Sequence, residues 1–336
     1  MIISKTPYRI SFFGGGTDYP SWYLENGGSV LATSIDKYCY LTCRYLPPFF
    51  EHKYRIVWSK TETANNLTDI QHPVISRVVD WMDIKEGLEI HHDGDLPARS
   101  GMGSSSSFVV GLIHVLSALK GQMISKHELL KSSLYLEQDI LQENVGSQDQ
   151  ALVTYGGFNK VDFLQTGQII VHPVTIGNDT QEQLNTKLML FFSGATRTAS
   201  KIVETFLSNL VNKKEHLNKI KGLVDQGLKI LSTGTDLDEF GYLLHEAWCL
   251  KKQLSTSVST NSCDEIYERA CKAGAIGGKL LGAGGGGFML FYVPLNSQSK
   301  VLSALSDLVF VPFKFEYQGS QIIYYEPNIN YESNIS

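Results

Sequence analysis

The sequence lacks the features that mark membrane-spanning, secreted and nucleic-acid-binding proteins. No window approaches the roughly 18 consecutive apolar residues of a membrane span, and the first residues lack the charged region and long apolar run of a secretory signal. Lysine and arginine number 29 against 34 aspartate and glutamate, a net charge of −5 with no basic block. These absences predict a cytoplasmic protein that binds neither a membrane nor nucleic acid.

Cysteine is also sparse. The five cysteines include no Cys-x-x-Cys pair, and no metal-ligand spacing accompanies the nine histidines. An odd, scattered set favours reduced thiols over a disulfide framework. Cys39 and Cys43 share one face of an alternating stretch, which favours core packing over metal binding.

The chain is long enough for about two domains. Its first hundred residues alternate apolar and polar residues as strands do, whereas later segments show helical spacing. One predicted helix ends near Gly121, and the next opens with the capping-box spacing of Ser125 and Glu128. We expect an N-terminal domain over 1–185 and a C-terminal domain over 186–336.

Three glycine-rich stretches, "FFGGGTD", "GMGSSSS" and "GAGGGG", stand beside predicted strand or helix ends. In the second, Gly101 and Gly103 would let the backbone approach a ligand closely. The amides and hydroxyls at the following helix N-terminus would donate to an anion. An ordinary serine N-cap is the alternative, but four serines exceed what a cap needs. We therefore expect phosphate binding by Gly101, Gly103, Ser104, Ser105, Ser106 and Ser107.

This stretch departs from the two common phosphate-binding motifs. No Gly-Lys-Ser/Thr follows it, so it is no Walker loop. A dinucleotide fingerprint would need glycine or alanine at position 106, where serine stands, and would follow the first strand.

With their flanking residues, the stretches "PYRISFFGGGTDYP", "PARSGMGSSSS" and "KLLGAGGGGF" resemble the three motifs of the GHMP small-molecule kinases. The resemblance spans residues 5 to about 293. It implies an α+β fold, with a domain like ribosomal protein S5 domain 2, a ferredoxin-like C-terminal domain and the active site between them. It also implies ATP and Mg²⁺. "GSQDQALVTYGGFNKV" and "LLHEAWCLKKQLS" resemble the D-glycero-D-manno-heptose 7-phosphate kinases and, more loosely, bacterial fucokinases.

Two carboxylates suit phosphoryl transfer. On a helical wheel Glu137 lies near the centre of an apolar arc, where a carboxylate is costly unless it is paired or binds a metal. The resemblance implies that it binds Mg²⁺, with Ser104 or Ser105 as a second ligand; a buried salt bridge is the alternative. Asp149 matches the segment that holds the family's catalytic aspartate, and Arg9 matches its basic partner. A turn-capping aspartate and a surface ion pair are the alternatives for these two.

The substrate side is expected at the first and third glycine stretches. A tight turn through Gly15 and Gly16 would present Asp18 to sugar hydroxyls, and Gly284 and Gly285 would lie beside the substrate. A second anion site is expected at a helix beginning near residue 199, with the alternative of a capped helix whose arginine makes a surface ion pair. It would take a phosphate that the sugar already carries, with Arg197 as its main ligand. The resemblance implies His245 and Lys252 as further lining of the same pocket.

These features predict an ATP- and Mg²⁺-dependent kinase that phosphorylates the anomeric hydroxyl of D-glycero-D-manno-heptose 7-phosphate. Trp58 and its neighbours are candidates for the lining of the adenine pocket. Fucose or another free sugar is the alternative substrate. A non-catalytic sensor of sugar and nucleotide on the same fold, and a Rossmann oxidoreductase, are the alternatives from other classes. The sequence does not indicate an oligomeric state.

Overall fold

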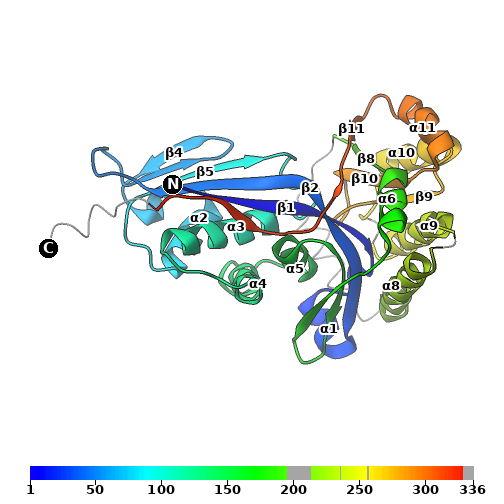
Figure 1. Cartoon of the computed structure of the whole chain (residues 1–336), viewed down its shortest axis with the longest axis horizontal. Coiled ribbons are helices and arrows are strands. Elements are labelled where there is room, and N and C mark those ends of the chain that lie inside the picture. Colours follow the sequence, from blue (N-terminus) through cyan, green and yellow to red (C-terminus); the bar gives the residue numbers. More distant parts are fainter. Residues whose placement is uncertain (195–212, 235, 256, 328–336) are drawn as a thin grey trace.

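The computed structural model describes residues 1–194, 213–234, 236–255 and 257–327. Within these ranges the chain forms two sheets with helices packed against them, which confirms the predicted α+β class (Figure 1). No helix in these ranges has both the length and the apolar composition needed to cross a membrane.

The larger sheet has nine strands and is formed mainly by the first half of the chain. Its path is β13-β1-β2-β5-β3-β4, with β12 and β6 paired to β2 and β7 paired to β6. All its strand pairs are antiparallel except β3 with β5, so it is no doubly wound parallel sheet. The strands are β1 (Ile2–Phe13), β2 (Gly28–Tyr45), β3 (Tyr54–Val57), β4 (Thr61–Ala64), β5 (Leu88–Gly94), β6 (Phe158–Phe163), β7 (Ile169–Pro173), β12 (Phe315–Glu316) and β13 (Gln321–Tyr325).

The helix α3 (Ser104–Leu119) packs against β1 and β2 on one side and against α4 and α5 on the other. Because it is enclosed on both sides, most of its residues are buried, including Val110, Leu112 and Leu116. The other helices of this half are α1 (Pro20–Asn26), a 3-10 turn η1 (Leu67–Asp69), α2 (Pro73–Trp81), α4 (Lys126–Tyr135), a π-helical turn η2 (Leu136–Ile140) and α5 (Gln148–Tyr155).

The smaller sheet has four antiparallel strands in the order β11-β8-β10-β9. Its strands are β8 (Leu188–Phe192), β9 (Gly277–Leu280), β10 (Phe288–Tyr292) and β11 (Val309–Val311). The accompanying helices are α6 (Asn178–Lys187), α8 (Lys214–Thr233), α9 (Asp238–Lys252), α10 (Asn261–Lys272), a 3-10 turn η4 (Leu295–Ser297) and α11 (Gln298–Ala304). Helix α9 lies beside β9 (Figure 1).

The two sheets are joined by packing and by the path of the chain. Gly227 on α8 lies so close to the end of β1 that a Cβ there would come within 2.8 Å of the Phe13 ring. After β11 the chain returns to the larger sheet, where β12 pairs with β2 and β13 pairs with β1. The division at residue 186 remains a proposal, and these last strands belong to the larger sheet although they follow that boundary.

Candidate active site

The three glycine-rich stretches meet at one cleft of about 1080 Å³. We call them the first (Gly14–Gly16), second (Gly101–Gly103) and third (Gly282–Gly287) glycine loops. Residues of all three loops line the cleft, together with Arg9, Asp18 and Asp149. Segments that are far apart in the sequence therefore form a single site.

The second and third glycine loops are in direct backbone contact. Gly101 has a φ of +84°, and a Cβ there would lie 2.6 Å from the carbonyl oxygen of Leu281. A Cβ on Gly282 would lie 2.4 Å from the Cα of Gly101. Only glycine fits both the left-handed backbone and this approach. The third loop thus presses against the turn that precedes α3.

Arg9 and Asp149 form a two-pronged ion pair at the floor of the cleft. Arg9 Nε donates to Oδ1 of Asp149 at 2.6 Å and Nη2 donates to Oδ2 at 2.7 Å. The remaining guanidinium nitrogen, Nη1, donates to the carbonyl oxygen of Gly101 at 2.7 Å. Arg9 is 4% exposed. A Cβ on Gly103 would lie 3.4 Å from Asp149 Oδ2, so the pair stands directly beside the start of α3.

Asp18 is held by a hydrogen bond from the first glycine loop. Its side chain accepts hydrogen bonds from the Gly16 amide and from Gln148 Nε2, both at 2.9 Å. A Cβ on Gly146 would lie 1.9 Å from Oδ2, so this wall has no room for a side chain. Burial, and then the nearby charge of Asp149, raise the pKa of Asp18. A sugar hydroxyl that reaches this carboxyl would therefore bind a side chain that is buried and fixed in one position.

Glu137 lies in the π-helical turn η2 and is fully buried, as the wheel predicted. Ser106 Oγ lies 3.2 Å and 3.1 Å from its two oxygens, and Gln150 Nε2 also donates to it. Burial raises the pKa of Glu137 to about 8 in spite of these donors. In the described part of the chain it forms no ion pair, so the salt-bridge alternative is not supported there.

The residues around Glu137 fit a magnesium ion. The available ligands are all oxygens, which Mg²⁺ prefers: the Glu137 carboxylate, the Ser106 hydroxyl and Gln150 Oε1, which is buried without a hydrogen-bond partner. Over the described ranges no cluster of three or more His, Cys, Asp or Glu side chains could hold a metal. A site with few protein ligands is what Mg²⁺ takes when phosphates and water supply the rest.

The four serines at the start of α3 have other contacts than the sequence predicted. Ser106, rather than Ser104 or Ser105, reaches Glu137. Ser104 Oγ instead accepts from the Arg99 amide at 3.1 Å, while Ser105 is exposed in the cleft wall. Ser107 is buried and donates to the Pro7 carbonyl at 2.8 Å, which fastens α3 to β1. The reason is helical geometry: successive residues of the first turn face four different directions.

The cleft has an aromatic wall that includes Trp58. The rings of Trp58 and His72 are 4.8 Å apart, and His72 stacks on Phe108 at 4.9 Å. Glu62 fixes this wall, because it accepts from Trp58 Nε1 at 3.1 Å and from the His72 amide at 3.2 Å. The sequence pointed to Trp58 and its neighbours but not to His72 or Phe108, because these two come from separate elements.

Two lysines in the cleft, Lys279 buried and Lys251 partly buried, were missed by sequence reasoning. Lys251 Nζ donates to the carbonyls of Leu280 and Gly282, at 2.9 Å and 2.5 Å, and Lys279 Nζ donates to the Phe12 carbonyl at 2.7 Å. Both lysines line the cleft. The sequence signal that could have found Lys251 is its place in "LLHEAWCLKKQLS". From this stretch the sequence pointed to Lys252, the next residue, as lining of an anion site.

His245 and Lys252 do not line this cleft. His245 Nδ1 lies 2.7 Å from the Tyr267 hydroxyl, and Lys252 pairs with Asp264 at 3.3 Å. On α9, Lys252 is one residue and thus about 100° around the helix from Lys251. Arg197, the predicted ligand of a second phosphate, lies outside the described residues. Gly284 lines the cleft, whereas the Gly285 amide donates to the Val258 carbonyl at 3.0 Å.

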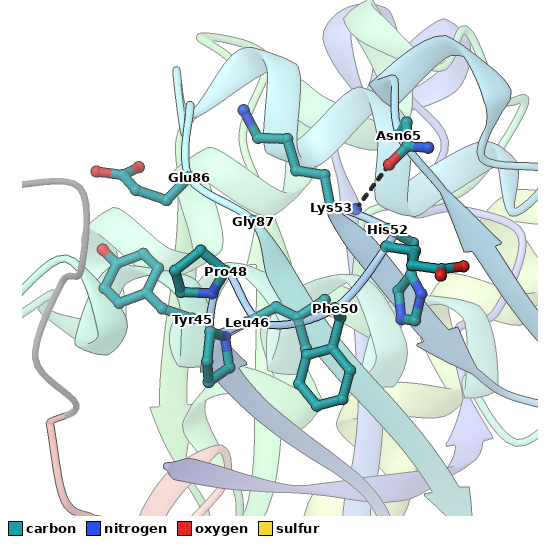
Figure 2. A pocket seen from close by; sticks show the side chains of 11 residues that line it. Tyr45, Leu46, Pro48, Phe50, His52, Lys53, Asn65, Glu86 and Gly87 are labelled. Atoms are coloured by element: carbon teal, nitrogen blue, oxygen red, sulfur yellow. Dashed lines mark hydrogen bonds between the residues drawn. The ribbon is translucent and has the colours of Figure 1, made fainter.

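A second, smaller hollow of about 230 Å³ lies around the loop that follows β2 and shares no lining residue with the cleft. Figure 2 shows it between Tyr45, Pro48 and Phe50, with the Lys53 amide donating to Asn65 Oδ1 at 3.1 Å. None of the glycine loops contributes to it. We therefore place the site in the larger cleft.

Comparison with known proteins defines the class of this chain. Residues 71–157 match the family model of the GHMP kinases N-terminal domain, and residues 228–309 match that of the GHMP kinases C-terminal domain. The two models together cover half of the chain. The chain is a phosphotransferase with an alcohol group as acceptor. It belongs to the GHMP kinases, which are ATP-dependent.

Several relatives of this chain are sugar kinases. The chain is 28% identical to D-glycero-alpha-D-manno-heptose 7-phosphate kinase of Campylobacter jejuni, over 90% of this chain and 93% of that protein. It is 26% identical to galactokinase of Pyrococcus furiosus, over 90% and 92% of the two chains. Its fold is that of a D-glycero-D-manno-heptose 1-phosphate kinase from Bacteroides thetaiotaomicron, with a TM-score of 0.79, 24% identity and coverage of 96% and 99%.

Proposed function

We propose that this sugar kinase transfers the γ-phosphoryl group of ATP to the anomeric hydroxyl of D-glycero-D-manno-heptose 7-phosphate, giving the 1,7-bisphosphate for nucleotide-activated heptose synthesis. The observation that carries the proposal is the Arg9–Asp149 pair, which is set beside the start of α3. Burial raises the pKa of Asp18, and the Asp149 carboxylate is close enough to add to that rise. Similarity to the Campylobacter heptose 7-phosphate kinase supports the choice of sugar.

In this proposal Asp149 orients the acceptor hydroxyl. The sugar oxygen forms a bond to the γ-phosphorus, the bond from that phosphorus to the bridging oxygen breaks, and ADP leaves. The proton of the hydroxyl passes to Asp149 and then to solvent. Because Arg9 binds both carboxylate oxygens, Asp149 is held in one orientation toward the acceptor.

The phosphates of ATP would lie at the N-terminus of α3, where free amides and the helix dipole favour anions. The backbone of Gly101 and Gly103 allows their approach, and Glu137 with Ser106 would hold Mg²⁺, which neutralises charge on the phosphates. The adenine would lie against the wall of Trp58 and His72. Asp18 and Gln148, which bond to each other at 2.9 Å, would bind sugar hydroxyls at the opposite end.

The 7-phosphate is assigned to Arg197 on the sequence pattern alone. The change Arg197→Ala should raise the KM for the phosphorylated sugar at least about tenfold, as the loss of one charge-assisted contact would. The KM for ATP should stay within about twofold, because ATP binds elsewhere. Equal loss of both substrates would remove this assignment.

The test is ATP consumption with a panel of acceptors: the heptose 7-phosphate, the free heptose, L-fucose and D-galactose. We expect a kcat/KM for the heptose 7-phosphate at least about tenfold above that for each free sugar. Preference for a free sugar would leave a sugar-1-kinase with another substrate. Binding of sugar and ATP without ADP release would favour the non-catalytic sensor.

A further inference from the structure

Three cations, two of them buried and the third partly buried, lie where the three glycine loops meet, and each donates to the backbone of a loop or of the strand before it. Arg9 bonds to Gly101 in the second loop, Lys279 bonds to Phe12 just before the first, and Lys251 bonds to Gly282 in the third. Arg9 is neutralised by Asp149. The described residues provide no carboxylate partner for either lysine.

Uncompensated buried charge is costly, so a site that keeps it is arranged for an anion. Lys279 also lines the cleft, but it is only 6% exposed and its amine donates to the Phe12 carbonyl. Lys251 is only partly buried and lines the cleft, where a ligand can reach it. An ammonium group has three N–H donors. Two of them are directed at the carbonyls of Leu280 and Gly282, and within the described ranges no third acceptor contacts this amine.

The position of Lys251 indicates which phosphate group of ATP its amine would contact. Its acceptor Gly282 packs directly on Gly101, and Gly101 in turn accepts from Arg9. The amine therefore lies at the junction of the second and third loops, on the side of the Arg9–Asp149 pair. Under the proposed function this junction is where the γ-phosphate and the acceptor meet.

We propose that Lys251 is a further catalytic residue whose ammonium group binds the phosphoryl group during its transfer. This inference rests on the proposed use of ATP in this cleft, but not on the identity of the sugar. A preorganised cation placed where charge develops stabilises the transition state without reorganisation. Lys251 then supplies positive charge to the transferring phosphoryl group. Arg9 supplies only part of that charge, because it is already paired with Asp149.

The ionisation of Lys251 gives the proposal a pH signature. The charged and titratable groups around the amine are Arg9 on β1, Lys279 on β9 and the Cys263 thiol on α10. Burial, and then the charge of Arg9, lower the pKa of Lys251 to about 7. The protonated form is the active one, so kcat/KM for ATP should fall as pH rises through this range. A bound polyphosphate favours the charged form, and its binding at pH 8 should take up a proton.

The first experiment compares Lys251→Met with Lys252→Met, its neighbour on α9 that pairs with Asp264 at 3.3 Å. Affinities are measured for ADP and for the β,γ-imido analogue of ATP, each with Mg²⁺, and thermal unfolding is followed alongside. In Lys251→Met the preference for the analogue over ADP should fall at least about tenfold, the loss of one charge-assisted contact. In Lys252→Met it should stay within about twofold. An unchanged preference in Lys251→Met overturns the proposal.

Kinetics with the best acceptor of the panel separate this role from others. In Lys251→Met, kcat should fall about 10²–10³-fold while the KM for the sugar changes less than about threefold. A rise in the sugar KM with kcat retained would assign Lys251 to the sugar's own phosphate and overturn the proposal. Lys251→Arg should recover at least about a tenth of the wild-type kcat and lose the fall above pH 7, because arginine stays protonated. If kcat/KM for ATP still fell above pH 7 in Lys251→Arg, that result would also contradict the proposal. This test holds even if Lys251→Met does not fold.

Discussion

Arg9 and Asp149 are 140 positions apart in the chain and are joined by two hydrogen bonds of 2.6 Å and 2.7 Å. The pair connects β1 to the start of α5, and the third arm of Arg9 reaches the second glycine loop. A charged carboxylate that receives two bonds from one guanidinium has little freedom to turn. Its orientation toward the cleft is therefore part of the fold.

The first prediction concerns Asp149. The change Asp149→Asn keeps the shape of the side chain but removes its charge and one acceptor for Arg9. We expect kcat to fall at least about 100-fold, in the range of general-base contributions, while the dissociation constant for ADP changes less than about threefold. Steady-state kinetics and calorimetric titration measure the two quantities.

A matched control for this change is Asp162→Asn. Asp162 is a carboxylate on β6 that pairs with Lys160 at 3.6 Å and His172 at 3.2 Å and is no part of the cleft lining. Its substitution should leave kcat within about twofold of wild type. If Asp149→Asn retained more than about a tenth of the wild-type kcat, the catalytic assignment would be wrong.

The second prediction separates Ser106 from other buried serines. Ser106→Ala removes the hydroxyl beside Glu137, so the Mg²⁺ concentration needed for half-maximal activity should rise at least about threefold. Ser133→Ala also deletes a buried hydroxyl, one that donates to the Leu130 carbonyl at 2.8 Å and is not among the residues that line the cleft. It should lower the melting temperature without moving the Mg²⁺ dependence. The same Mg²⁺ dependence in both variants would refute the metal site.

Some of the site could be predicted from the sequence because its signals are local. The capping box of Ser125 and Glu128 is present, and α3 ends just before Gly121, as each short pattern indicated. The burial of Glu137 followed from helical periodicity, which is a local property as well. Sequence motifs that lie within one segment thus predicted the start, the end and the buried face of helices in that segment.

Other features of the site depend on which segments of the chain pack against each other. A local sequence pattern carries no information on such contacts. The choice among Ser104, Ser105 and Ser106 depended on the rotation of α3 relative to η2. The choice between Lys251 and Lys252 depended on how α9 packs on β9. Lysines on a solvated helix face look the same in sequence as lysines that line a cleft. The return of β13 to pair with β1 likewise needed the whole sheet.

The third prediction tests the contact between the second and third glycine loops. Gly101 and Gly121 both have positive φ, of +84° and +70°, but a Cβ on Gly121 would meet nothing within 4 Å. Gly121→Ala therefore reports the backbone cost alone, about 1–2 kcal/mol of unfolding free energy. Gly101→Ala adds a clash with the Leu281 carbonyl and should weaken ADP binding at least about tenfold. Equal ADP affinity in the two variants would show that the loops need not touch.

The last prediction concerns pH and the stability of the larger sheet. Glu89 on β5 is 6% exposed and accepts from Arg44 at 2.6 Å and from Arg55 at 3.1 Å, with His91 Nε2 at 3.0 Å. Burial alone would raise its pKa, but the bonds from His91 and the arginines lower it to about 2. A carboxyl whose pKa is lower in the folded than in the unfolded state stabilises the fold above its unfolded pKa. That stabilisation is lost as pH falls toward 2.

Glu89→Gln should therefore lower the free energy of unfolding at pH 7 by about 1–3 kcal/mol, and the difference from wild type should shrink between about pH 4.5 and pH 2. Chemical denaturation across this pH range measures it. Glu215→Gln is the control, because its i,i+4 pair with Lys219 is exposed and should contribute nothing measurable. Since Glu89 is not among the residues that line the cleft, kcat should stay unchanged in both variants. A difference that stayed constant with pH would mean that the Glu89 charge does not stabilise the sheet, and that the variant acts through lost packing alone.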